Sequence, residues 1–193
     1  MTNPQKLAVQ VRTIRAEAWR VSDDELDVTG RLVDDRPAGG PHWWGEDQGA
    51  TIHDMTLTIR VRYPDLVITG ASGSMASHPY TLCPDALPPL QQLVGLSVAR
   101  GFTRAVNERF GRQAGCAHMT ALIQALGPVV RQAAGAAFRE ADAPPRADRD
   151  LWFVNTCQAW REHGPLHARL AKGDIEGMKA LSARTKPARE TAR

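Results

Sequence analysis

Residues 52–63 alternate between mostly polar and apolar side chains, and this pattern constrains the fold more than any other feature of the chain. One parity holds Ile52, Asp54, Thr56, Thr58, Arg60 and Arg62, and the other holds Met55, Leu57, Ile59, Val61 and Tyr63. A strand that buries one face and exposes the other to water is typical of an antiparallel sheet. The segment is therefore predicted to be a strand of such a sheet.

Neighbouring segments supply further strands and then helices. Residues 14–21 and 26–33 are predicted to pair as a hairpin, and residues 66–75 to return beside residues 52–63 after the turn at Pro64. A short helix capped by Asp85 is predicted, followed by helices over 102–110 and from 115 to about 141, the latter kinked or interrupted at Pro128. A further helix is predicted over 151–162, stopped by Gly164 and Pro165. The fold class is α+β, with an antiparallel sheet of three to four strands in the N-terminal half packed against C-terminal helices.

The length of 193 residues fits a single α+β domain over residues 1–170, followed by a basic, loosely ordered tail over residues 171–193. No apolar run approaches the roughly 18 residues that a membrane span needs. The N-terminal residues lack the apolar core of a secretory signal. We expect a cytoplasmic protein that makes no membrane contact.

The net charge of +3 hides an acidic stretch over residues 21–47 and a basic tail from residue 169 onward. The tail lacks the accompanying patterns of a nucleic-acid-binding domain, which favours a solvated tail over nucleic-acid binding. A non-catalytic module that binds a partner through these two charged regions is one functional alternative. The pattern leaves open whether the chain forms a homo-oligomer.

Cys116 is the first candidate for chemistry because it lies at the predicted start of a helix, where the helix dipole favours a thiolate. His118 follows two residues later, and either His118 or His53 could act as a general base. Asp54 could orient that base, although His53 and Asp54 are adjacent in a strand and point to opposite faces. The alternative for each residue is a structural role, with Cys116 and His53 packed in the core.

A metal site is a second interpretation of the same residue types. Three cysteines without a Cys-x-x-Cys pair do not form a disulfide framework and are expected to be reduced thiols. Together with histidine they offer the nitrogen and sulfur ligands that zinc prefers. The predicted ligands are His78, Cys83, Cys116 and Cys157, with His118 as a further candidate.

Two groups of residues could contact a substrate. Trp43 and Trp44 lie in a loop rich in Gly and Pro and could form an aromatic wall, or a lid on the sheet. Arg100 and Arg104 belong to a set of arginines that could bind phosphate groups, or could be a solvated helix face.

Several short motifs in a fixed order are similar to those of a bacterial family, domain-of-unknown-function family 2889. They are Ile52-His53-Asp54-Met55, Pro79-Tyr80-Thr81-Leu82-Cys83-Pro84, Leu93-Val94-Gly95-Leu96 and Gly115-Cys116-Ala117-His118-Met119-Thr120. The resemblance covers roughly residues 10–165. In the segment over residues 157–164, Gln158 and His163 stand where the family has His and Asp. The resemblance implies a shared fold and supplies no reaction.

These observations favour a small hydrolase, an acyl thioesterase acting on an aromatic acyl-CoA, with Cys116 as nucleophile. A zinc or iron–sulfur protein with a structural or carrier role is the alternative, beside the partner-binding module.

Overall fold

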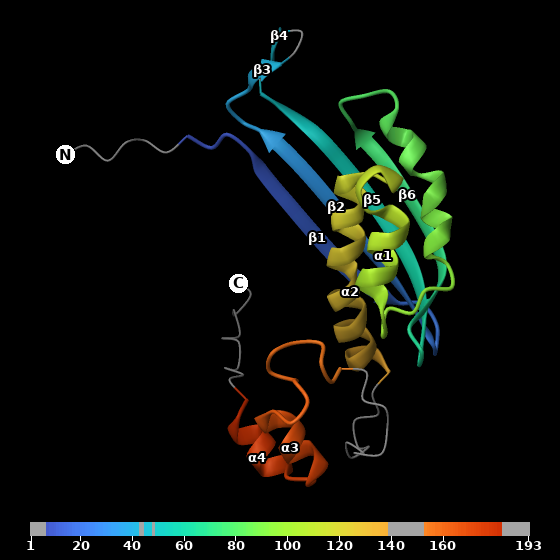
Figure 1. Cartoon of the computed structure of the whole chain (residues 1–193), viewed down its shortest axis with the longest axis vertical. Helices are drawn as coiled ribbons and strands as arrows, with labels where there is room; N and C mark the ends of the chain where they lie inside the picture. Colours follow the sequence, from blue (N-terminus) through green and yellow to red (C-terminus); the bar gives the residue numbers. More distant parts are fainter. Residues whose placement is uncertain (1–6, 43–44, 48, 139–152, 183–193) are drawn as a thin grey trace, which may run out of the picture. The chain divides into compact units, whose positions relative to one another are not determined.

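The structure is a computed structural model of the chain, and it describes residues 7–42, 45–47, 49–138 and 153–182. The chain divides into two compact units, Met1–Arg139 and Glu140–Arg193. The first unit carries the sheet and the two longer helices (Figure 1). The predicted boundary at residue 170 falls inside the second unit.

The first unit is built on a four-stranded antiparallel sheet with the order β1-β2-β5-β6. Its strands are β1 (Val11–Arg20), β2 (Glu25–Arg36), β5 (Ala50–Arg62) and β6 (Val67–Ser77). The short strands β3 (Gly40–His42) and β4 (Gly45–Asp47) follow β2 in the chain and precede β5, and they form a separate two-stranded sheet. The predicted hairpins and the predicted fold class are confirmed.

Three short 3₁₀ helices and two α-helices follow the sheet in this unit. They are η1 (Cys83–Ala86), η2 (Pro88–Leu93), α1 (Phe102–Phe110), η3 (Arg112–Ala114) and α2 (Ala117–Ala137). The helix expected after Asp85 is therefore two 3₁₀ helices, and Asp85 lies inside η1 instead of capping it. Prolines at positions 84, 88 and 89 lack the N–H groups that a longer α-helix would need. Pro128 does not interrupt α2.

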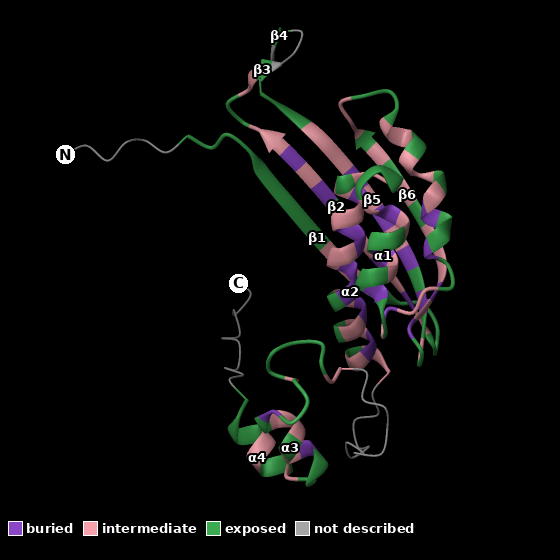
Figure 2. Cartoon of the chain, in the orientation of Figure 1, coloured by how far each residue is buried: buried purple, intermediate pink, exposed green. Residues whose placement is uncertain are grey.

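All of these helices that contact the sheet lie on one of its faces, and the core is between them (Figure 2). The apolar parity of β5, seen in Leu57 and Ile59, is fully buried there. Leu122 and Leu126 of α2 pack against the same layer. Burying each such side chain contributes about 1.5–3 kcal/mol. The opposite face of β5 is mostly polar, as the alternation predicts.

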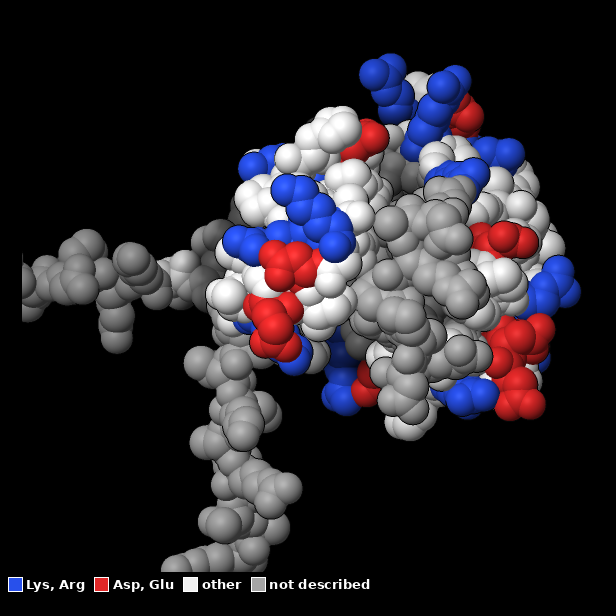
Figure 3. Space-filling model, turned by 90° about the horizontal axis from the view of Figure 1, so that it is seen from below, with Lys and Arg blue, Asp and Glu red and all other residues white. Residues whose placement is uncertain are grey.

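That polar face is held by pairs between neighbouring strands. Arg31 binds Asp54 through two hydrogen bonds of 2.7 and 2.6 Å, and the hydroxyl groups of Thr29 and Thr58 lie 2.8 Å apart. Seen from below (Figure 3), basic and acidic side chains of the described residues are interspersed instead of gathering by sign.

The second unit contains α3 (Pro165–Ala171) and α4 (Ile175–Ala180). The helix predicted over residues 151–162 is wrong for the described part, because residues 153–162 form turns. Pro165, expected to follow the end of that helix, instead begins α3. Proline is favoured at the first position of a helix, where no partner is needed for an N–H group. Among the described residues, no helix is long and apolar enough to cross a membrane.

Candidate active site

Strand register places three polar residues in one row across the helix-covered face of the sheet. Arg12 of β1 pairs with Asp34 of β2, and Asp34 pairs with His53 of β5. Directly opposed residues in an antiparallel sheet have their side chains on one face, about 5 Å apart. The row therefore follows from the register alone.

Asp34 is the centre of this row and the one buried charged side chain among the described residues. Its Oδ1 accepts a hydrogen bond of 2.6 Å from Nε of Arg12, and its Oδ2 accepts one of 2.8 Å from Nη2. Oδ2 also lies 3.0 Å from Nδ1 of His53. The Arg12 guanidinium holds the pKa of Asp34 below its ordinary value, so the carboxylate is ionised although it is buried.

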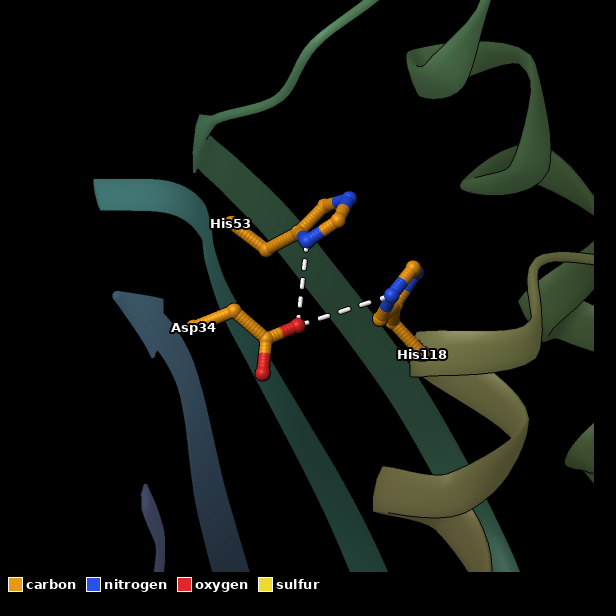
Figure 4. A group of neighbouring side chains, drawn as sticks. All are labelled: Asp34, His53 and His118. Atoms are coloured by element: carbon orange, nitrogen blue, oxygen red, sulfur yellow. Dashed lines mark hydrogen bonds and ion pairs between the residues drawn. The ribbon is translucent and has the colours of Figure 1, made fainter. Parts of the chain in front are cut away.

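The start of α2 brings His118 over this row from the helix layer. Figure 4 shows His118 pointing from the helix toward Asp34 and His53, which point up from the sheet. Nε2 of His118 lies 3.5 Å from Oδ2 of Asp34. The rings of His118 and His53 have their centroids 3.7 Å apart and are tilted by 30° relative to each other. Three elements distant in sequence thus meet at one carboxylate.

Burial sets the protonation state of both histidines. Loss of solvent lowers the pKa of His118 below its ordinary value, and the nearby His53 and Arg12 charges act in the same direction against Asp34. Burial also lowers the pKa of His53, although its bond to Asp34 opposes the shift. Both imidazoles are therefore neutral near pH 7, the form that can accept a proton or bind a metal.

Cys116 completes the group from the position just before α2. It is the N-cap residue of the helix, as predicted, with an extended backbone and no side-chain capping bond. Its Sγ lies 3.7 Å from Nδ1 of His118, within hydrogen-bond range for sulfur. We call Arg12, Asp34, His53, Cys116 and His118 the Asp34 cluster.

Other predicted site residues lie elsewhere. Asp54 is on the opposite face of the sheet from His53 and is bound to Arg31, because adjacent strand residues alternate in direction. Arg100 is exposed, and the exposed Arg104 forms an ion pair of 2.7 Å with Glu108. Trp43 and Trp44 lie outside the described residues.

The predicted metal ligands are distributed over several elements. Cys83 is half-buried in η1, and Nδ1 of His78 lies 2.9 Å from the carbonyl oxygen of Tyr80. Cys157 is exposed in the second unit. Among the described residues, the group of three potential ligands that converges is instead Asp34, His53 and His118, with ligand atoms within 4.8 Å of one another.

Sequence reasoning missed Arg12 and Asp34 as site residues. The available signal was parity, since Asp34 continues the buried series Leu26, Val28, Gly30 and Leu32 along β2. An aspartate on a buried parity needs a partner. Arg12 carried no comparable signal, because its role depends on the register of β1.

A groove of about 530 Å³ lies between the end of α1 and the start of α2. It is lined by Asn107, Gly111, Arg112, Ala117, Thr120, Ala121 and Gln124. Its size is within the range of small-molecule sites. Ala117, the residue after Cys116, forms part of its wall.

The fold and the cluster together define an α+β protein in which a cysteine contacts a histidine and the same histidine contacts a buried aspartate. The model of the family described as Protein of unknown function (DUF2889) matches residues 10–132, and the chain belongs to this family. The match covers all four strands of the main sheet and most of α2, so it includes every residue of the cluster. Searches of the curated proteins and of the solved structures found no match.

Proposed function

We propose that the protein is a cysteine-dependent acyl hydrolase that cleaves thioesters, with Cys116 as nucleophile and His118 as general base. The observation that carries the proposal is the continuous contact from Sγ of Cys116 to Nδ1 of His118, and from Nε2 of His118 to Asp34. A thiol is activated when a base contacts it and a third group orients that base.

Cys116, His118 and Asp34 each have a defined task in this reaction. His118 takes the thiol proton on Nδ1, and its Nε2–H donates toward Asp34, which stabilises the imidazolium. The Cys116 thiolate attacks the carbonyl carbon, and the leaving thiolate departs with the proton from His118. Water, activated by the same imidazole, then cleaves the acyl-cysteine and restores the thiol.

The start of α2 supports the charged species in these steps. N–H groups in the first turn of a helix have no carbonyl partner within it, and the helix dipole is positive there. Both effects favour the oxyanion formed at the attacked carbonyl. The 21 residues of α2 are bound firmly to the sheet, so this end of the helix is held in place.

The substrate class is the finer part of the proposal. The groove beside Ala117 can accept the part of a thioester that is not transferred, and Arg112 places a positive charge at its wall. An aromatic acyl-CoA remains our first candidate for the substrate. We place the reaction in the cytoplasm, where thiols are kept reduced.

The test is turnover of a panel of aliphatic and aromatic acyl-CoA thioesters, with CoA release followed by chromatography. Cys116→Ala should lower kcat/KM by about a thousandfold or more, because a covalent nucleophile is lost. Cys83→Ala is the matched control, since this half-buried cysteine lies outside the cluster. His118→Ala should allow an acyl group to be trapped on Cys116 and detected by mass spectrometry. Unchanged turnover by Cys116→Ala would refute the proposal.

Asp54→Asn is a second control that follows from the structure. Because its carboxylate is on the opposite face and bound to Arg31, turnover should stay within about twofold of the unmodified protein.

A further inference from the structure

We propose that Asp34, His53 and His118 bind a divalent transition-metal ion such as Zn²⁺, and that the bound ion switches off the thiol chemistry of Cys116. The binding site stands on its own geometry, and the switch rests on the proposed function. The ligand set differs from the cysteine-rich set that the sequence indicates.

The distance from Asp34 to each of the two histidines fits a metal ion, and all three ligand atoms lie within 4.8 Å of one another. Zn²⁺ binds imidazole nitrogen and carboxylate oxygen at about 2.0–2.1 Å, so two ligand atoms of a tetrahedral site lie about 3.3 Å apart. Oδ2 of Asp34 lies 3.0 Å from Nδ1 of His53 and 3.5 Å from Nε2 of His118. One separation is slightly shorter and the other slightly longer than the distance expected between two ligand atoms of a tetrahedral site. Both nitrogens face the same oxygen (Figure 4).

The donor chemistry also suits zinc and its neighbours in the first transition series. Two imidazoles and one carboxylate leave a position open for water, as in many zinc sites.

Arg12 has two opposing effects at this site. Its bidentate bond fixes the carboxylate in one orientation, as an outer partner of a metal ligand does. Its positive charge also offsets the negative charge of Asp34, which weakens attraction for a cation. We therefore expect exchangeable binding, not a permanent structural ion, which suits a switch.

The switch follows from the two nitrogens of His118. As a general base, His118 must carry its proton on Nε2, toward Asp34, and keep Nδ1 free for the Cys116 proton. A metal ion on Nε2 moves the proton of the neutral ring to Nδ1. That tautomer cannot accept a proton from Cys116, so metal binding and base catalysis exclude each other.

Binding is tested by equilibrium dialysis of the full chain against Zn²⁺ with elemental analysis, and by the visible absorption of bound Co²⁺. The unmodified chain should bind one ion. His53→Ala should reduce the affinity for that ion at least tenfold. Cys116→Ala should keep that ion, because sulfur contacts the other nitrogen of His118. His78→Ala is the matched control, a histidine outside the cluster. Circular dichroism checks that each variant is folded. Equal binding by His53→Ala, or no binding by the unmodified chain, would overturn the site.

The switch is tested by thioester turnover with Zn²⁺ and again after a chelator is added. Zn²⁺ should inhibit the unmodified chain reversibly, and the ratio of turnover with and without Zn²⁺ should approach one in His53→Ala. Activation by Zn²⁺ would refute the proposal that metal binding and base catalysis exclude each other, but it would not refute the metal site. If no thioester is cleaved, the proposed function fails, and the dialysis result still decides the metal site.

Discussion

Replacing Arg12 by alanine is expected to destabilise the first unit far more than replacing Arg31 by alanine. Both arginines bind an aspartate of the neighbouring strand through two hydrogen bonds, with all four distances between 2.6 and 2.8 Å. The two pairs lie on opposite faces of the sheet. Asp34 is 2% exposed in its side chain and Asp54 is 18% exposed. Burial is therefore the main difference between them.

The magnitude follows from what each substitution leaves behind. Removing one partner of a fully buried ion pair costs about 3–5 kcal/mol, because the remaining charge is buried without compensation. The Arg12 side chain is 38% exposed and His53 still contacts Asp34, so we expect about 2–3 kcal/mol. With an m-value of about 2 kcal/mol per molar urea, the midpoint falls by about 1–1.5 M. Arg31→Ala should leave it nearly unchanged, because its pair is solvated.

The Arg12 penalty should also depend on pH. The Arg12 charge contributes to the lowered pKa of both His53 and His118, so its loss raises these pKa values in the folded state. A group with a raised folded-state pKa stabilises the folded state as pH falls. The penalty should thus be smaller at pH 5.5 than at pH 7.5.

Urea unfolding followed by circular dichroism measures both effects. Methyl resonances from the core of the first unit separate its transition from that of the second unit. Titration of the histidine ring protons by NMR measures the pKa change directly. Equal midpoint shifts for Arg12→Ala and Arg31→Ala, or a penalty that is the same at both pH values, would refute the reasoning.

Two further predictions concern the base and the helix packing. Thioester kcat/KM should fall only as pH drops well below about 6.5, the ordinary histidine pKa, because burial lowers the pKa of His118 and its neutral form is active; a loss centred above 6.5 would contradict this. Gly30→Ala should cost about 1–3 kcal/mol in thermal unfolding, since its Cβ would lie 2.7 Å from Leu126 and 2.8 Å from Leu122. Gly70→Ala should be tolerated, because its Cβ would lie 3.7 Å from Cβ of Arg60, an ordinary van der Waals distance.

Local patterns were sufficient to predict the four strands of the main sheet and the two α-helices of the first unit. A period of two places the residues of β5 on opposite faces whatever else the chain does, so His53 and Asp54 had to diverge. Phe102, Val106 and Phe110 recur at helical spacing, and all three are buried on one face of α1. Cys116 precedes α2 as expected.

Local patterns failed where several signals competed. Residues 153–162 contain apolar side chains at helical spacing, yet they form turns, including a bond from the N–H of Asn155 to the carbonyl of Trp160. In sequence, Gly164 and Pro165 together predict a helix stop, although the missing N–H of proline also suits a helix start. Tertiary contacts decide whether such a segment becomes a helix or a turn, and these contacts cannot be identified from the local sequence.

The sequence by itself determined that Cys116 would begin a helix, and that His53 would face the buried side of a strand. It could not show that Arg12 and Asp34 lie beside His53, because strand register depends on pairing between segments that are not adjacent in the chain. Nor could it show that His118 lies above them, because that depends on how α2 packs on β1, β2 and β5. Chemistry at the Asp34 cluster therefore exists only after the sheet has paired and the helix has packed, since a buried carboxylate acquires its partners from three other elements of the fold.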